Sequence, residues 1–309
     1  MSKIIVILGP TSSGKSDIAI RLAKKFDGEI ISADSRQIFR GMNIGTGKIE
    51  GKYDNTKKVF LSRNIPHYMI DIVSPRADFN VTKFKKQTEK IVADVLQRGK
   101  LPIICGGTGF WIQAIVDDVN FPEVKPDWKL RERLEKYSAD KLFAMLKKLD
   151  PARAKNIDSK NKVRLIRAIE ICKTIGKVPK IPAFAKASAG KQNTEYQFLQ
   201  IGLNLSKEKL HENIAKRVKD RFKQGMIKEV EKLHQNGLPW KKIQSFGLAY
   251  FWIPLYLQNK ISKEELFEKV IQVEKSYAKR QITWFKRDKR IKWLENYKKI
   301  EKTTKAFLK

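Results

Sequence analysis

Cysteine, histidine and long apolar runs are all scarce in this chain of 309 residues. Its two cysteines, Cys105 and Cys172, form no Cys-x-x-Cys pair, which excludes a disulfide-rich scaffold and a cysteine-rich zinc module. The three histidines, at positions 67, 211 and 234, are scattered without the spacing of metal ligands. We therefore expect structural roles for them.

No apolar run reaches the length of a membrane span. The longest, residues 246–257, contains Pro254 and falls well short of the ~20 residues that a spanning helix needs. The N-terminal run, residues 4–8, is shorter than a signal-peptide core and is followed by a Gly-Pro turn. These observations predict a soluble, cytoplasmic protein with no membrane partner.

Acidic side chains are about half as frequent as basic ones, 33 against 65, so the formal net charge is +32. The excess is uneven, because residues 1–120 carry a net +7 and residues 121–309 carry +25. Such self-repulsion is usually relieved by a polyanionic partner, and a habitually Lys-rich surface is the alternative. Composition alone leaves nucleic-acid binding open.

Strand and helix patterns alternate over the first 105 residues. Helical spacing of apolar side chains predicts helices over 16–26 and 79–96. Short apolar, β-branched runs predict strands at 4–8, 29–33, 68–73 and 101–105. This alternation indicates a parallel sheet wrapped by helices.

The pattern changes near residue 119, where a connector containing two prolines begins. Amphipathic helices are predicted over 128–148 and 161–173, followed by a low-complexity linker at 177–192. A β-like segment at 196–203 is expected to return to the sheet, and from residue 207 onward the pattern is helical. We predict a core of residues 1–119 and 195–309 and a mainly helical insertion over 120–194.

Residues 9–16, GPTSSGKS, match the phosphate-binding pattern GxxxxGK[ST] between a predicted strand and a predicted helix. In this motif backbone N–H groups converge on phosphate oxygens, Lys15 supplies a point charge, and the Ser16 hydroxyl is a ligand for Mg²⁺. The motif does not distinguish a nucleoside triphosphate from another diphosphate. Its members are Gly9, Pro10, Thr11, Ser12, Ser13, Gly14, Lys15 and Ser16.

Two further segments follow predicted strands and are therefore expected at the same sheet edge. Asp34 follows the strand at 29–33, where a carboxylate can accept a proton or bind Mg²⁺ through water. Capping of a helix by Asp34 or Ser35 is the alternative. The GGTG segment at 106–109 offers the Thr108 hydroxyl, and a plain strand-to-helix turn is the alternative there.

Basic side chains recur at helical spacing. Arg164 and Arg167 are three residues apart, and Arg217 and Arg221 are four apart. Such pairs suit phosphate binding, and a solvated helix face is the other interpretation.

Residues 279–287, KRQITWFKR, interleave cations with aromatic rings. Cations there would neutralise phosphates while a ring stacks on an exposed base. Trp284 and Phe285 fit a hydrophobic core equally well, and we expect at least one of them to lie there.

Taken together, these segments resemble the tRNA dimethylallyltransferase family, bacterial type. They follow the family's order and cover almost the whole chain, and the ADSRQ and KRQxTW segments are specific to it. The matching blocks are GPTSSGKS at 9–16, ISADSRQIFRGMNIGTGK at 31–48, PHYMIDIVSP at 66–75, PIICGGTGFW at 102–111, RLIRAIEI at 164–171 and AKRQITWFKR at 278–287. The chain departs from the usual pattern at Lys219, Arg221 and Leu248-Ala249.

The resemblance implies a P-loop NTPase-like α/β fold and a prenyl transfer. A dimethylallyl group would pass from dimethylallyl diphosphate to N6 of the adenosine 3′ of the anticodon, position 37, in tRNA. By the same resemblance the P-loop holds the diphosphate with Mg²⁺ at Ser16, and Asp34 is the general base. Thr11 and Arg217 match positions near the reacting diphosphate.

The resemblance also implies that the insertion grips the anticodon stem-loop of tRNA. We expect the protein to act as a monomer. The residues that match tRNA-contacting positions are Asp34, Ser35, Arg36, Gln37, Thr108, Arg131, Val163, Arg164, Leu165, Ile166, Arg167, Lys279, Arg280, Gln281, Thr283, Trp284, Lys286 and Arg287. A small-molecule or nucleotide kinase on the same fold is one alternative, and it predicts ATP turnover without RNA. An RNA-binding module with an inactive phosphate loop is the other.

Overall fold

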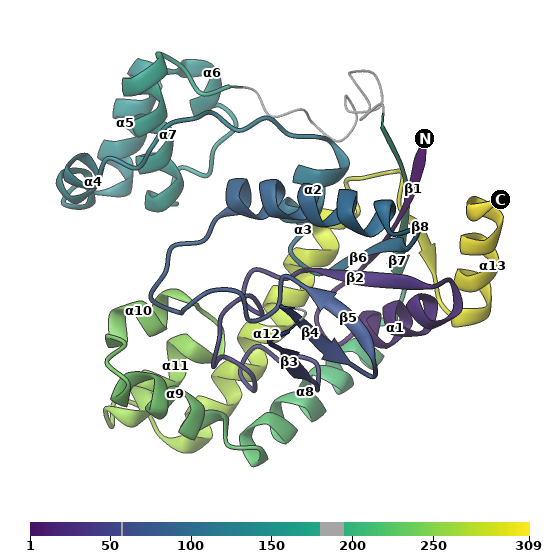
Figure 1. Ribbon diagram of the computed structural model, residues 1–309. Coiled ribbons are helices and arrows are strands. Elements are labelled where there is room, and N and C mark those ends of the chain that lie inside the picture. Colours follow the sequence, from purple (N-terminus) through teal and green to yellow (C-terminus); the bar gives the residue numbers. More distant parts are fainter. Residues whose placement is uncertain (57, 180–194) are drawn as a thin grey trace. The chain divides into compact units, whose positions relative to one another are not determined.

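The computed structural model describes residues 1–56, 58–179 and 195–309 (Figure 1). Contacts divide the chain into two compact units, Met1–Asp118 with Ala183–Lys309, and Val119–Pro182. The sequence pattern sets the corresponding boundaries at 119/120 and 194/195. Most of the predicted linker over 177–192 falls outside the described residues.

One eight-stranded sheet runs through the larger unit, in the order β3-β4-β5-β2-β6-β1-β7-β8. Five neighbouring pairs, from β5 to β8 along this order, are parallel, whereas β3–β4 and β4–β5 are antiparallel. The predicted α/β fold with a mainly parallel sheet is therefore confirmed. The strands are β1 (Ser2–Leu8), β2 (Gly28–Ala33), β3 (Lys52–Asp54), β4 (Val59–Ser62), β5 (Ile65–Tyr68), β6 (Leu101–Gly106), β7 (Tyr196–Leu203) and β8 (Lys292–Leu294).

Helices cover both faces of this sheet. The helices of the larger unit are α1 (Lys15–Lys25), α2 (Val81–Gln97), α3 (Gly109–Val116), α8 (Lys207–Lys223), α9 (Met226–Gln235), α10 (Trp240–Ser245), α11 (Ala249–Leu257), α12 (Lys263–Phe285) and α13 (Tyr297–Leu308). Ile5 and Ile7 of β1 share a core with α1 and α13, which lie together in Figure 1. Ile4, Val6 and Leu8 point the other way, into a core with α2, α3 and the later helices. Burial on both faces explains why β1 is an uninterrupted apolar run.

The strand order brings three loops to one edge of the sheet. β6 lies between β1 and β2, so the loop after β1, Asp34 after β2, and Thr108 after β6 are neighbours. The Thr108 amide donates to the Ala33 carbonyl at 3.1 Å, and the Ser35 amide donates to Thr108 Oγ1 at 3.0 Å. A Cβ atom on Gly106 would lie 2.2 Å from the Ala33 carbonyl oxygen, so glycine is required for this close approach.

The predicted strand at 68–73 is wrong, because β5 ends at Tyr68. Met69 and Asp71 have φ angles of 63° and 56°, in the left-handed region that strand residues do not adopt. Arg40 donates from Nε to the Asp71 carbonyl and from Nη2 to the Ile72 carbonyl, which replaces strand pairing. The apolar run that suggested a strand reflects a loop buried in the core.

Other differences concern short or interrupted elements. The predicted helix over 128–148 is two helices, because Ser138 begins the second by accepting a hydrogen bond from the Lys141 amide. β3, β4 and β8 have only three or four residues, too few to show a period, and were not expected. Within the described parts of the chain no helix is both long and apolar enough to cross a membrane. The smaller unit contains α4 (Trp128–Glu135), α5 (Ala139–Leu149), α6 (Pro151–Ala154) and α7 (Lys162–Ile175).

The loop after Met42 is held in place by one carboxylate from α9. Glu229 Oε2 accepts hydrogen bonds from the amides of Asn43 and Ile44, both at 2.7 Å. Glu229 Oε1 accepts from the Gly45 amide at 3.0 Å and from the Tyr250 hydroxyl at 2.8 Å. Four donors on one carboxylate fix the start of the loop that carries Gly47.

Replacing this carboxylate is expected to destabilise the larger unit. Glu229→Ala leaves three backbone amides and a phenol without their acceptor, and we expect the free energy of unfolding to fall by about 2–3 kcal/mol. Chemical denaturation measures the change. The matched control is Glu231→Ala on the exposed side of α9, which should shift stability by less than about 0.5 kcal/mol. Equal losses in the two variants would contradict this role for Glu229.

Candidate active site

The phosphate-binding loop connects β1 to α1 and its geometry is set by two left-handed residues. Gly14 has φ +81° directly before α1 begins, and Ser12 has φ 61°. Lys15 is partly buried, and its Nζ donates to the Pro10 carbonyl at 3.1 Å. Burial is the main cause that lowers the pKa of Lys15. An anion beside Lys15 would favour its charged form.

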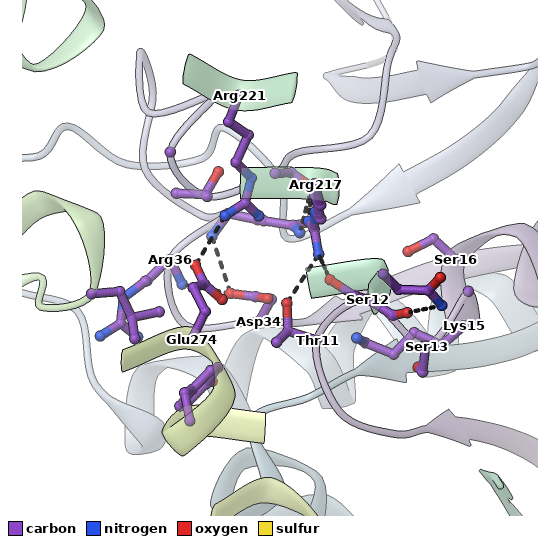
Figure 2. Close-up of a pocket in the computed structure, with 18 of the residues that line it drawn as sticks. Thr11, Ser12, Ser13, Lys15, Ser16, Asp34, Arg36, Arg217, Arg221 and Glu274 are labelled. Carbon is purple, nitrogen blue, oxygen red and sulfur yellow. Dashed lines mark hydrogen bonds and ion pairs between the residues drawn. The ribbon is translucent and has the colours of Figure 1, made fainter. Parts of the chain in front are cut away.

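Arg217 of α8 joins three segments at this loop (Figure 2). Its Nη1 donates to Thr11 Oγ1 at 3.0 Å and to Ser12 Oγ at 3.5 Å, and its Nη2 donates to the Gly47 carbonyl at 3.0 Å. Burial, reinforced by the nearby charge of Arg221, lowers the pKa of Arg217 to about 10. Arg217 is thus a cation held by neutral oxygens, which leaves its charge available to a bound anion.

Gln281 of α12 holds the loop from the other side. The Thr11 amide donates to Gln281 Oε1 at 2.8 Å, and Gln281 Nε2 donates to the Gly107 carbonyl at 2.8 Å. The side chain is buried, with 6% of its surface exposed. One amide therefore fixes the distance between the phosphate loop and the loop after β6.

Asp34 shapes a turn and also lines the cavity, and because residues 35–38 form a turn and not a helix, the alternative of a helix cap is wrong. Its Oδ1 accepts from the amides of Arg36 at 2.9 Å and Gln37 at 3.4 Å, which shapes the turn after β2. Its Oδ2 takes no part in these two bonds, and the side chain lies beside Thr11 in Figure 2. Turn formation and a second role at the cavity are therefore compatible.

These groups surround a cavity of about 350 Å³. Its cations outnumber its anions and come from the turn after β2, the phosphate loop and α8. The acidic side chains at its wall are Asp17, Asp34, Asp220 and Glu274, and the basic ones are Lys15, Arg36, Lys216, Arg217 and Arg221. Such a cavity suits a small, multiply charged anion beside a carboxylate.

Comparison with known proteins identifies the family of this chain. The family model described as IPP transferase matches residues 37–288. A tRNA dimethylallyltransferase from Thermoanaerobacter sp. (strain X514) is 40% identical over 314 residues, covering 99% of this chain and 96% of the relative. The chain belongs to the IPP transferase family. The resemblance inferred from the sequence is confirmed at this level.

Solved structures of IPP transferase relatives share the fold. A tRNA delta(2)-isopentenylpyrophosphate transferase from Staphylococcus epidermidis is 36% identical with a TM-score of 0.70, and each chain is covered completely. A eukaryotic dimethylallyltransferase acting on tRNA is 26% identical with a TM-score of 0.73, covering 96% of this chain and 74% of that one. These neighbours support the P-loop NTPase-like fold predicted for this family member.

The structure gathers the predicted catalytic and diphosphate-binding residues. Thr11, Asp34 and Arg217 line one cavity, together with the loop from Ser12 to Ser16. Gly9 and Pro10 shape the start of the loop, where a Cβ atom on Gly9 would lie 3.0 Å from Ser13 Oγ.

The predicted tRNA-contacting residues at the end of α12 and in the turn after it differ in exposure. Gln281 lines the cavity, and its Oε1 and Nε2 are bonded to the Thr11 amide and the Gly107 carbonyl, which gives it a positioning role; its contact with tRNA stays a prediction. Trp284 is half-buried, with the Arg287 guanidinium 5.6 Å from its ring, and Phe285 lies in the core. The exposed members of the set are Lys279, Arg280, Thr283, Lys286 and Arg287.

The predicted contacts after β2 and β6 join the same region. Arg36 and Gln37 line the cavity, and Arg36 Nε donates to the Phe246 carbonyl at 2.6 Å. Ser35 and Thr108 are joined by the hydrogen bond described above. The segment after β2 is therefore held by its contacts with Phe246 and Thr108 as well as by its own turn.

In the smaller unit, two predicted contacts lie in the core. Leu165 and Ile166 are 0% and 4% exposed and pack in that unit's own core, and their contact with tRNA stays a prediction. Their spacing in α7 reflects an apolar helix face. Val163, 73% exposed, and Arg164 lie on the outer face.

Arg131 and Arg167 share one buried carboxylate, Glu170, whose side chain is 1% exposed. Arg131 binds it with two hydrogen bonds of 2.8 Å, Arg167 binds Oε2, and the Asp127 amide donates to Oε1 at 2.7 Å. Burial alone would raise the pKa of Glu170, but these hydrogen bonds hold it below its ordinary value. The two arginines are thereby oriented, with 27% and 35% of their side chains exposed.

Sequence interpretation missed Glu274, Tyr277 and Gly47. Glu274 and Tyr277 precede Gln281 by seven and four residues on α12, so the helical spacing from Gln281 would have indicated them. Gly47 carries no such signal, because its role depends on Arg217, 170 residues away in the chain.

We expect Glu170→Gln to destabilise the smaller unit by about 2–3 kcal/mol at pH 7, below the value for fully buried pairs because both arginines are partly exposed. The Glu170 pKa is depressed in the folded state, so its stabilisation is present above the ordinary glutamate pKa of about 4.3 and disappears as pH falls through the folded value. The difference between the proteins should therefore shrink in acid. Hydrogen exchange of α7 amides measures it.

Glu135→Gln is the matched control for Glu170→Gln. Glu135 lies in the same unit, but its side chain is 57% exposed and it pairs with Lys162 at 3.6 Å. We expect a change below about 0.5 kcal/mol. If the Glu170→Gln protein were as stable as this control, the stabilising role of Glu170 between Arg131 and Arg167 would be refuted.

Proposed function

We propose that this chain transfers a dimethylallyl group from dimethylallyl diphosphate to N6 of the adenosine 3′ of the anticodon, position 37, in tRNA, with release of diphosphate. The observation that supports this most is the convergence of a phosphate loop, Arg217 and a strand-end carboxylate, Asp34, on one cavity. A group-transfer site needs the anion-binding groups and the base side by side, and this cavity has both.

In the proposed reaction the N6 lone pair forms a bond to C1 of the prenyl donor while the C1–O bond breaks. The electron pair of that bond remains on the departing diphosphate, whose charge Lys15 and Arg217 stabilise. The N6 proton passes to Asp34, whose Oδ1 is engaged by the turn and whose Oδ2 is the acceptor we assign. Positioning matters because an exocyclic amine of adenine is a weak nucleophile.

The residues present fit a magnesium ion that is shared with the diphosphate. The Ser16 hydroxyl and the Asp34 carboxylate line the same cavity, and oxygen ligands are those that Mg²⁺ prefers. The described residues contain no group of three or more His, Cys, Asp or Glu side chains able to hold a metal, so most of the ligands would be diphosphate oxygens and water. Mg²⁺ would neutralise charge on the leaving group.

For tRNA, we propose that the exposed cations of α7, and those at the end of α12 and in the turn after it, contact the anticodon stem-loop. The names of the relatives support tRNA as the acceptor. Lys279 and Arg280 share α12 with Gln281, and Lys286 and Arg287 follow directly after its last residue, so a phosphate backbone bound there would lie along the end of the helix that holds the phosphate loop. The target base must leave its stack to reach Asp34.

The decisive measurement is transfer of labelled prenyl from dimethylallyl diphosphate to unmodified tRNA, compared with Asp34→Asn. Asparagine keeps the Oδ1 acceptor of the turn and removes the base, so we expect transfer to fall by about 10²–10⁴-fold with tRNA affinity unchanged. Asp27→Asn, an exposed aspartate whose side chain pairs with Lys100, is the control and should keep full activity. ATP hydrolysis without prenyl transfer would refute this proposal and indicate a kinase instead.

The magnesium assignment is tested separately with Ser16→Ala. We expect this variant to require at least about tenfold more Mg²⁺ for half-maximal transfer, because one protein ligand is lost. Titration of Mg²⁺ at saturating donor measures this. An unchanged titration curve would exclude Ser16 as a ligand.

A further inference from the structure

A buried ion pair crosses the wall of the cavity beside Arg217. Arg221 lies one turn further along α8, and its Nη1 donates to Glu274 Oε1 of α12 at 3.0 Å (Figure 2). The side chains are 6% and 5% exposed. Among the described residues the buried Nε of Arg221 has no hydrogen-bond partner. The carboxylate therefore satisfies this guanidinium only in part.

Arg221 also lies against Arg217. A Cβ atom built on Gly47 would be 1.8 Å from Nη2 of Arg217 and 2.2 Å from Nη2 of Arg221, so the two nitrogens are within about 4 Å of each other. Two guanidinium groups this close repel each other in a partly buried site. The lowered pKa of Arg217, caused by burial and by Arg221, agrees with this geometry.

Only one carboxylate, Glu274, is bonded to this pair of cations in the described structure. Arg217 is bonded to the hydroxyls of Thr11 and Ser12 and to a carbonyl, none of which carries charge. The two guanidiniums therefore keep an excess positive charge beside the phosphate loop. A diphosphate carries several negative charges and enough terminal oxygens to bind both groups together.

We propose that Arg221 binds the diphosphate of the prenyl donor together with Arg217, and that Glu274 is the positioning residue that holds Arg221 there. The role rests on the proposed function and adds a second guanidinium to its donor site. When the C1–O bond breaks, the electron pair stays on the diphosphate oxygen, and Arg221 shares the stabilisation of that charge with Arg217 and Lys15. Glu274 accepts no proton and touches no reacting atom.

The alternative is an ion pair that only stabilises the fold. Buried pairs of this kind are often replaced by apolar residues of similar volume without loss of stability, which permits a clean test. The variant Arg221→Met/Glu274→Met removes both charges and leaves no unpaired partner. Its matched control is Arg98→Met/Glu29→Met, since Glu29 pairs with Arg98 through two hydrogen bonds of 2.6 and 2.7 Å at the opposite end of β2 from Asp34.

The experiment measures binding of inorganic diphosphate with Mg²⁺ by calorimetry, together with the KM for dimethylallyl diphosphate, tRNA affinity and melting temperature. For the cavity variant we expect diphosphate affinity to fall at least tenfold and KM to rise similarly, with tRNA affinity and melting temperature near wild type. The control pair should leave diphosphate affinity unchanged. A folded cavity variant that binds diphosphate within twofold of wild type would overturn the proposal.

Arg221→Lys, with Glu274 retained, covers the case in which the double variant melts early. Lysine keeps the charge against Glu274 but loses the planar fork, so we expect intermediate diphosphate affinity, and wild-type affinity would count against Arg221. Failure of the two proposals can be told apart. If the wild-type protein transfers the prenyl group and the cavity variant binds diphosphate as tightly as wild type, the Arg221 role alone is refuted. If diphosphate binding depends on Arg221 but the wild-type protein transfers no prenyl group, the proposed function alone is refuted.

Discussion

The position of β6 between β1 and β2 is the constraint on which the site depends. Parallel pairing on both sides of β6 places the ends of the three strands at the same level, and the loop after each strand then belongs to one cavity. Gly106 permits the close approach to Ala33 that this pairing requires. Without this order the phosphate loop and Asp34 would be on separate parts of the edge.

Helices complete what the sheet begins. α8 contributes Arg217 to the phosphate loop, and α12 contributes Gln281 from the opposite side. α9 contributes Glu229, which fixes the loop whose Gly47 carbonyl receives Arg217. Side chains from the last third of the chain therefore hold both the phosphate loop and the loop that carries Gly47. This explains why so much of the sequence separates the parts of one site.

Local signals were sufficient for part of this arrangement. The strands at 4–8, 29–33 and 101–105 and the phosphate loop could be predicted because their patterns lie within about ten residues of sequence. The pairing of Arg221 with Glu274, 53 residues apart, depends on how α8 packs on α12 and carries no local pattern. For Leu165 and Ile166 the local signal was sufficient but was not used. Their spacing in the helix indicates a core position, whereas the family resemblance suggested a contact with tRNA.

The insertion of Val119–Pro182 between α3 and β7 determines the order in which the protein can form during synthesis. β1 and β6 are available to pair once the first 106 residues have left the ribosome, but β7, the other neighbour of β1, ends at Leu203. The core of the smaller unit is complete by Val178. That unit can therefore fold first. One edge of β1 remains unpaired until β7, almost two hundred residues later in the chain, has been synthesised.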